Sequence, residues 1–519
     1  MKTLRYFANI AFMTSLAIFA SCSSDNDIEE NNGNSENPSA EKLVFTATFE
    51  SDEATRATLV KESNSIERMH WEAGDQIAVY SGSAGPGVFT ATSIDASNTK
   101  AEFSGVNLAG TYYCAIYPAN LSNLSFEKAK FTANISANQV VTNGYSYDRS
   151  AIMMTARTTP SEKKFEFKNV PALLKFTLTN NNGKVRYIKV YSNVGGKAMA
   201  GTFNTFTNPN TGAITVDGVT NYQDYVQLEI PQGTSEGTFY IATIPGTPLN
   251  GGFTILLESE LESGSQSIYK RVYSGDITFN RSNIYDMGTY DISSVSFMDN
   301  VVDLGLPSRT LWCTKNITYS GTSTTFVNSI YDNGGYYAWG EIYAWGQDNG
   351  KTTYSSNTYT LGSDIYTSST LKKQNDAAYQ IEGHAFCMPT YDQIYELYDK
   401  CTLTYKISSP LNGHYGVQIT SNSNGRTLWL PAAGYHCDAG SQSGLNSENS
   451  VCHYWSRSLY TGVTSTAYAH CLDFKSSGLD EHGWLQNLVT GSRTWYDRRF
   501  AGKSIRPVVL DTKIAPIYE

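Results

Sequence analysis

The chain has 519 residues, 36 tyrosines, a formal net charge of -10 at pH 7 and only 17% charged residues. This length exceeds the core of a typical single domain, so two or three domains are expected. The acidic balance, together with the lack of a clustered basic stretch, excludes a nucleic-acid partner, because phosphate binding needs a basic face.

Residues 1–21 have the pattern of an export signal. Lys2 and Arg5 precede an apolar run over 6–19, which is too short for a permanent membrane-spanning helix. Cys22 follows two small residues, as in a bacterial lipobox, where the cysteine is acylated and becomes the first residue of the mature chain. The alternative is an ordinary signal peptidase site with an incidental cysteine.

The acidic residues after Cys22 resemble the signal that sends lipoproteins of Bacteroides-like bacteria to the outer face of the outer membrane. Each acyl CH₂ that enters the bilayer stabilises the attachment by about 0.8 kcal/mol. We therefore expect a surface-exposed lipoprotein of the cell outer membrane, attached through Cys22. Residues 22–41 are polar with almost nothing to bury, which predicts a flexible tether.

The folded part is predicted to begin at Lys42. Leu43, Phe45, Ala47 and Phe49 alternate with residues that suit an outer face, which is the period of a half-buried strand. Similar alternation continues at 187–191, 226–230 and 253–257, and no run before residue 293 predicts a helix longer than a turn or two.

The dipeptide Thr55-Arg56 is followed over residues 71–80 by Trp-Glu-Ala-Gly-Asp-Gln-Ile-Ala-Val-Tyr. Gly74 predicts a tight turn that leads into a strand. A first strand, a Thr-Arg dipeptide and this turn-strand, in that order, resemble the fimbrillin family of Bacteroidales pilus proteins. Residues 165–176 are similar to the opening strands of that family's second domain.

This resemblance implies a mainly β fold with two transthyretin-like, Greek-key β-sandwich domains at 42–162 and 163–296. It also implies assembly: a protease removes the first strand after an arginine, and a neighbouring fimbrial subunit fills the groove by donor-strand exchange. Arg56 is the candidate for proteolytic processing. Its alternative role is that of a solvated loop arginine.

From residue 297 the composition changes, because seven of the eight tryptophans and six of the seven histidines lie beyond this point. The segments that carry a further resemblance are residues 302–312, 335–341, 388–393, 429–435, 454–458 and 504–508. In this order they are similar to the Fibrobacter major paralogous domain. The resemblance implies an α+β, C-type-lectin-like domain over 297–519. A weaker similarity links this region to formylglycine-generating enzymes.

Thr390 is predicted to cap a helix, with Gln393 completing a capping box. Ile394, Leu397, Tyr398 and Cys401 then recur on one face, so Cys401 is expected to be packed. Six cysteines in the last third permit several disulfide connectivities, or they are buried thiols. The sequence leaves both open.

Three His/Cys pairs, His436-Cys437, Cys452-His453 and His470-Cys471, carry zinc-type ligands. Neighbours on a strand point to opposite faces, so one pair cannot easily serve one metal, and we expect packed cysteines and no bound metal or cofactor. No His-Glu-x-x-His or Gly-x-Ser-x-Gly motif is present, and the formylglycine active-site pair cannot be placed on these cysteines. We therefore expect no catalytic residues.

The calcium tripeptides of sugar-binding C-type lectins are absent from the sequence. Aromatic platforms remain as candidate contacts for a glycan or for a host or bacterial surface ligand. Two polar-aromatic loops supply the candidates Trp345, Asp348, Asp480, His482 and Trp484. The alternative is that each tryptophan belongs to the core.

Together these features indicate a non-catalytic cell-surface fimbrial subunit, at the tip or as an accessory adhesin, that presents a lectin-like head. One alternative is a surface glycan-binding lipoprotein for nutrient capture. The other is an enzyme of the formylglycine-generating type.

Overall fold

The computed structural model describes residues 42–50, 60–63, 66–68, 70–81, 84–120, 124–127, 129–260, 266–321, 323–344, 353–406, 409–437, 444–462, 467–475 and 496–510. The chain is mainly β, as predicted. Within these ranges, no helix combines the length and the apolar composition needed to cross a membrane.

The first sheet closes on itself. Its strands, in spatial order, are β1 (Leu43–Phe49), β12 (Lys164–Asn169), β11 (Met154–Thr158), β7 (Tyr113–Tyr117), β4 (Gln76–Ser81), β5 (Ala84–Ile94) and β6 (Lys100–Gly105). β1 confirms the strand predicted from the alternation, with Leu43, Phe45 and Ala47 buried. The predicted domain limits remain a prediction. Strand pairing crosses the predicted limit between residues 162 and 163, because β12 pairs with β1 and β11.

Three smaller sheets accompany it in the chain before residue 297. They comprise β2 (Val60–Ser63) with β3 (Ile66–Arg68); β16 (Ile214–Gln223), β15 (Ala200–Thr207), β9 (Lys130–Ile135) and β8 (Ser125–Glu127); and β19 (Pro248–Leu249) with β22 (Ile277–Thr278). The one short helix described in this region is the 3-10 helix η1 (Arg149–Ala151).

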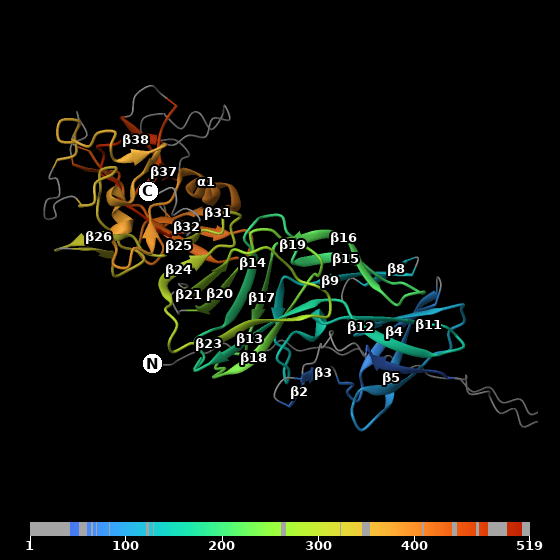
Figure 1. Ribbon diagram of the computed structural model, residues 1–519. Coiled ribbons are helices and arrows are strands. Elements are labelled where there is room, and N and C mark those ends of the chain that lie inside the picture. The colour runs from blue at the N-terminus through green and yellow to red at the C-terminus, as the bar shows by residue number, and fades with distance from the viewer. Residues whose placement is uncertain are drawn as a thin grey trace, which may run out of the picture. The chain divides into compact units, whose positions relative to one another are not determined.

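A nine-stranded sheet runs from the middle of the chain into its C-terminal part (Figure 1). Its spatial order is β10 (Asn138–Val140), β17 (Tyr225–Glu229), β14 (Tyr187–Ser192), β20 (Phe253–Glu260), β21 (Gln266–Tyr273), β24 (Met298–Asp303), β25 (Leu311–Cys313), β39 (Val508–Val509) and β30 (Phe386–Cys387). A three-stranded sheet of β18 (Gly237–Thr243), β13 (Ala172–Thr179) and β23 (Ile284–Asp291) shares a hydrophobic core with it.

The central strands of the nine-stranded sheet are buried on both faces. On β20, Ile255 and Leu257 pack into the core shared with β13, whereas Leu256 packs into the core of the C-terminal part. Successive side chains of a strand point to opposite faces, so the run over 253–257 serves two cores at once. The C-terminal part is therefore joined to the preceding part by strand pairing and by a common core.

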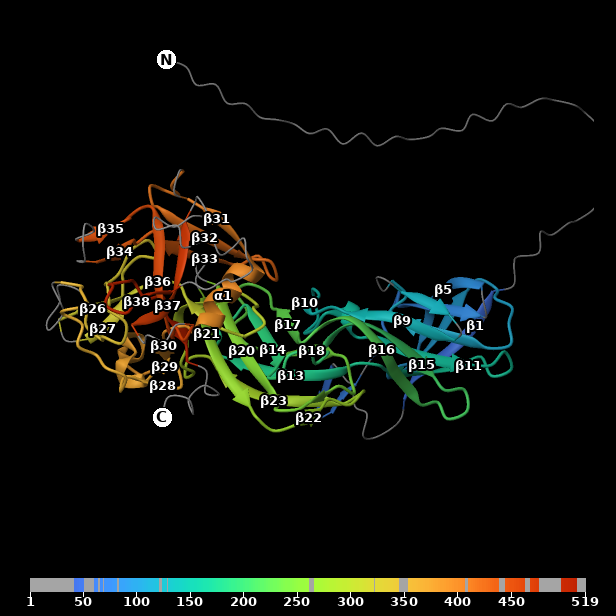
Figure 2. The same cartoon turned by 90° about the horizontal axis from the view of Figure 1, so that it is seen from above.

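The C-terminal part is built from short strands and small helices, and β36 and β37 run side by side in it (Figure 2). Its other sheets comprise β28 (Tyr366–Thr367), β29 (Thr370–Leu371), β36 (Val451–Leu459), β37 (Tyr468–Lys475) and β38 (Tyr496–Arg498); β31 (Cys401–Tyr405), β32 (Gly416–Ser421) and β33 (Thr427–Pro431); β26 (Ile317–Ser320) with β27 (Ser323–Phe326); and β34 (Tyr435–His436) with β35 (Leu445–Asn446). The helices are α1 (Tyr391–Lys400) and the 3-10 helices η2 (Lys373–Asn375) and η3 (Ala377–Gln380).

The aromatic segments noted in the sequence meet in this core. The indole Nε1 of Trp339 donates to the carbonyl of Ser456 at 2.8 Å, and that of Trp455 donates to the carbonyl of Tyr337 at 2.8 Å. Both tryptophans are fully buried. The two segments thus hold each other in place, which explains why each needs a tryptophan rather than a purely apolar ring.

The capping box of α1 is confirmed. The Thr390 hydroxyl accepts from the backbone N–H of Gln393 at 3.2 Å, and the Gln393 side-chain oxygen accepts from the N–H of Thr390 at 2.8 Å. Ile394 and Leu397 are buried, as the helical spacing predicts, and Tyr398 is half-buried. Cys401 is packed as expected, but it is the first residue of β31 and lies outside the helix.

Thr390→Ala should therefore lower the stability of α1 by about 1 kcal/mol, because the backbone N–H of Gln393 loses the hydroxyl that accepts its hydrogen bond. Hydrogen exchange of the first-turn amides measures this loss. Thr390→Ser keeps the hydroxyl and serves as the control. Equal exchange rates in the two variants would contradict the role of the cap.

Candidate functional site

β1 fills a slot between two other strands of the first sheet. It pairs parallel with β12, with Thr46 opposite Lys164, and antiparallel with β6, with Thr46 opposite Glu102. At the β12 edge the N–H of Thr46 donates to Lys163 O at 3.0 Å, and the N–H of Glu50 donates to Phe167 O at 2.9 Å. The strand is therefore held along both edges by backbone hydrogen bonds.

The inward face of β1 completes an aromatic core. The ring of Phe45 contacts those of Phe89, Tyr113 and Phe165, with centroid distances of 5.2, 5.0 and 4.7 Å. These rings come from β5, β7 and β12, so one β1 side chain contacts three other strands of the sheet. We call the slot between β6 and β12, with this aromatic lining, the β1 groove.

The Trp-Glu-Ala-Gly-Asp turn lines one end of the β1 groove. Trp71 is buried and stacks on Phe49, with ring centroids 4.5 Å apart and planes 19° apart. Asp75 fixes the turn, since its carboxylate accepts from the N–H of Glu72 at 2.9 Å and from the Tyr117 hydroxyl at 2.9 Å. Gly74 has a φ of 88°, a left-handed conformation that favours glycine.

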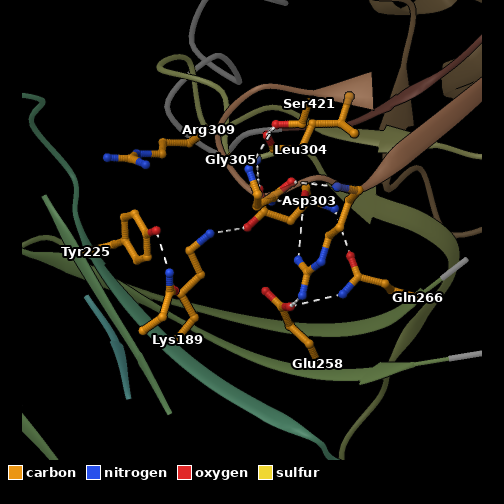
Figure 3. A network of polar contacts seen from close by, with 12 residues as sticks. Lys189, Tyr225, Glu258, Gln266, Asp303, Leu304, Gly305, Arg309 and Ser421 are labelled. Carbon is orange, nitrogen blue, oxygen red and sulfur yellow. Dashed lines mark hydrogen bonds and ion pairs between the residues drawn. The ribbon is translucent and has the colours of Figure 1, made fainter. Parts of the chain in front are cut away.

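A second cluster of polar residues lies where the nine-stranded sheet meets the C-terminal part; we call it the junction cluster (Figure 3). Lys189 on β14 forms a buried ion pair with Asp303 at the end of β24. Glu258 on β20 pairs with Arg426 at 2.6 Å and is completely buried. Gln266 on β21 donates to Glu258 at 3.0 Å and accepts from the N–H of Asp303 at 2.9 Å.

The junction cluster tethers the C-terminal part by its backbone as well. The carbonyl of Asp303 accepts from Asn424 at 2.8 Å and from Arg426 at 3.3 Å. Buried charges cost several kcal/mol unless they are paired and hydrogen-bonded, and here each main charge has an opposite partner. The cluster therefore links β14, β20, β21 and β24 to the segment around Arg426 through paired and hydrogen-bonded groups.

The charges shift the acid-base behaviour of Asp303. Burial alone would raise the pKa of its carboxyl, but the positive charges of Lys189 and Arg426 outweigh burial and lower the pKa to about 2. Asp303 is therefore ionised across the whole physiological pH range.

Four of the thiols of the C-terminal part are buried rather than activated, whereas Cys437 is half-buried. Burial raises the pKa of the Cys401 thiol to about 12, and it also raises the pKa of Cys313, Cys452 and Cys471. A nucleophilic cysteine needs the opposite shift, because the thiolate is the reactive form.

In the Cys452-His453 pair, the two neighbouring residues contact different groups. Cys452 donates to Leu430 O at 3.4 Å, whereas Nδ1 of His453 lies 3.3 Å from Nζ of Lys503. His470 stacks on Tyr391 with centroids 4.0 Å apart. Among the residues that the structure describes, no group of three or more His, Cys, Asp and Glu side chains could hold a metal ion.

Half-buried rings gather on α1, β37, β38 and the end of β36. This ring cluster consists of Tyr391, Tyr460, Tyr468, His470 and Tyr496. Tyr460 and Tyr496 stack in parallel with centroids 3.8 Å apart, and Tyr460 meets His470 edge to face at 5.2 Å. Such rings suit contact with the C–H faces of sugars.

The site residues predicted from the sequence are Cys22, Arg56, Trp345, Asp348, Asp480, His482 and Trp484, and all of them lie outside the described residues. Sequence reasoning missed the junction cluster. The sequence feature that could have indicated this cluster is a charged residue inside an otherwise apolar strand, such as Lys189 between Ile188 and Val190. The ring cluster was also missed, because the stacking of Tyr391 on His470 and of Tyr460 on Tyr496 depends on tertiary contacts.

No family model matches this chain. A search of curated proteins likewise found no match. Among solved structures, the chain is similar to a candidate cell adhesion protein of Bacteroides ovatus, with 16% identity, 50% of this chain and 96% of that chain covered, and a TM-score of 0.31. A candidate cell adhesion protein of Bacteroides uniformis gives 16% identity, coverage of 50% and 97%, and a TM-score of 0.29. The tip fimbrial protein Mfa3 of Porphyromonas gingivalis, in a C-terminally truncated form, gives 12% identity, coverage of 46% and 80%, and a TM-score of 0.21.

Asp303→Asn should destabilise the chain by about 3 to 5 kcal/mol, because it leaves the Lys189 ammonium buried without its carboxylate. The substitution preserves the size of the side chain and an acceptor for the Gly305 N–H. The control is Asp217→Asn, which breaks an exposed pair with Lys130 and should cost less than about 1 kcal/mol. Urea denaturation measures both, and equal losses would contradict the importance of the junction cluster.

The Asp303 carboxylate also predicts a pH dependence of the unfolding free energy. The pKa of Asp303 is lower in the folded chain than the value of about 3.9 expected when unfolded, so its contribution is present above pH 4 and is lost as the pH falls towards 2. The loss should amount to about 2 to 3 kcal/mol. Unfolding free energies between pH 6 and pH 2 should fall less steeply in Asp303→Asn; parallel slopes in the two proteins would refute the assignment.

Proposed function

We propose that this chain is a non-catalytic fimbrial subunit of the bacterial surface, of the fimbrillin type. It joins other subunits by strand addition at the β1 groove and presents its C-terminal part, the proposed lectin-like head, at the tip or as an accessory adhesin. Before the cut after Arg56, a lipid on Cys22 attaches the chain to the outer membrane.

The observation that carries the proposal is the position of β1. It is the first strand of the folded chain, it lies between β6 and β12, and Arg56 follows it before β2 begins. A cut after Arg56 separates β1 from the rest of the chain without interrupting any other described strand. The vacated slot would present two unpaired strand edges and an apolar lining, which favour a replacement strand.

The junction cluster supports the assignment of the C-terminal part as a head. A module that contacts a surface transmits force to the subunit that carries it, and strand pairing between β21 and β24 with buried ion pairs resists bending there. A further domain of this size on every subunit would obstruct end-to-end stacking, which favours an end position over the shaft.

A second candidate is a surface glycan-binding lipoprotein for nutrient capture, and the ring cluster favours it. Its five half-buried rings come from α1, β37, β38 and the end of β36, and they add aromatic candidates to those that the sequence suggested. The same surface would serve an adhesin, so it does not separate the two functions. Assembly at the β1 groove does separate the two functions, because a free glycan-binding protein does not need to join other subunits.

Limited digestion of the full chain with an arginine-specific protease should cut after Arg56, and the cut protein should then form oligomers. Arg56→Lys retains the charge but should slow the cut at least tenfold and keep the protein monomeric. Arg68→Lys, in β3, is the matched control and should behave like the parent. A cut chain that stays monomeric at high concentration would count against strand addition.

A further inference from the structure

The end of β1 carries two neighbouring side chains that each contact a separate, preformed receptor. Phe49 contacts Trp71, and Glu50 contacts Arg281 and Ser282. Neither receptor belongs to β1. Both therefore bear on which strand could take the place of β1.

The Glu50 receptor is a built carboxylate site. Arg281 donates to both carboxylate oxygens at 3.2 Å, in the two-pronged geometry that guanidinium groups favour, and the Ser282 hydroxyl donates to one of them at 2.7 Å. The Glu50 side chain is only 7% exposed. A carboxylate in this position is thus bound by three hydrogen bonds away from most of the solvent.

The site is held in place without β1. Arg281 also donates to the carbonyl of Asn169 at 2.9 Å, and the backbone N–H of Ser282 donates to Pro171 O at 3.0 Å. Ser282 itself is buried. Since Asn169 and Pro171 lie at the link between β12 and β13, these contacts remain when β1 leaves.

The Phe49 receptor is equally independent. Trp71 donates its backbone N–H to Asn98 O at 2.8 Å, and its ring contacts Phe103, Tyr117 and Phe167 at centroid distances of 5.0 to 5.5 Å. A flat ring stacked on Trp71 fits between these side chains.

A small residue is required at Ala47, two positions before Phe49. Ala47 is completely buried, and it lies opposite Ala101 on β6 and Phe165 on β12. A larger side chain there would overfill a packed core, which typically costs more than it gains.

Building on strand addition at the β1 groove, we propose that the groove selects its partner by the end of the incoming strand. The selected segment of a second subunit has a small residue, then any residue, then an aromatic residue followed directly by a carboxylate. The aromatic residue stacks on Trp71 and the carboxylate binds Arg281 and Ser282. Because side chains alternate, a shift by one residue would remove both contacts, so this end also fixes the register.

The test is a competition between peptides for the full chain cut after Arg56. A peptide with the sequence of residues 42–51 competes at equal concentration with its Glu50→Gln form. Mass spectrometry then measures the ratio of the two peptides bound to the cut chain. We expect the parent to be favoured about 10- to 100-fold, the range for hydrogen bonds to a charged group. Thr46→Ser in the peptide, on the outer face, is the control and should give a ratio near one.

A protein variant isolates the receptor. In chains with Arg281→Met, the preference for the parent peptide over Glu50→Gln should fall to less than about threefold, because the charged partner is gone. The peptide series leaves the protein unchanged, so its results do not depend on whether the Arg281→Met variant folds.

The outcomes distinguish the selection rule from strand addition itself. If the parent peptide is retained and Glu50→Gln is retained equally well, the selection rule is wrong and strand addition stands. If the cut chain retains no peptide at all, both the rule and the proposed function are wrong.

Discussion

Hydrogen bonding along both edges of β1 is the constraint on which the first sheet depends. The sheet is closed only because β1 joins β12 on one side to β6 on the other. Without it, both neighbours would have open edges and the ring of Phe45 would leave a void among three strands. An unpaired edge over an apolar groove is unstable in water, so a segment that restores the pairing binds there strongly. In the proposed assembly, closure of the sheet and recruitment of a partner strand would follow from the same interactions.

The junction cluster imposes a different constraint on the C-terminal part. Apolar packing alone tolerates small slips between layers, whereas buried ion pairs are stable only in one geometry. Lys189 and Glu258 project from the face of the nine-stranded sheet opposite the core shared with β13, and their partners come from segments beyond residue 300. The ion pairs therefore link this face of the sheet to β24 and to the segment around Arg426, while the apolar residues around them supply most of the stability.

Local patterns predicted the local structure well. The alternation over 43–49 gave β1, because a strand with one buried face imposes a two-residue period, and Thr390 with Gln393 gave the start of α1, because helix capping is a property of a few adjacent residues. The pairing of Glu50 with Arg281 could not be predicted, since 231 positions separate the two residues and each is an ordinary charged residue in its own surroundings. The strand at 164–169 was assigned to the following domain for a similar reason, because its parallel pairing with β1 depends on tertiary contacts.

The occupant of the β1 groove in the assembled state is the most direct test of this account. Electron cryomicroscopy of fibres that contain this chain would show whether the strand between β6 and β12 is continuous with the same molecule or with its neighbour. We predict a strand of the neighbouring subunit, with its carboxylate at Arg281. A strand that remains connected to residues 51–59 of the same chain in the assembled fibre would contradict the account.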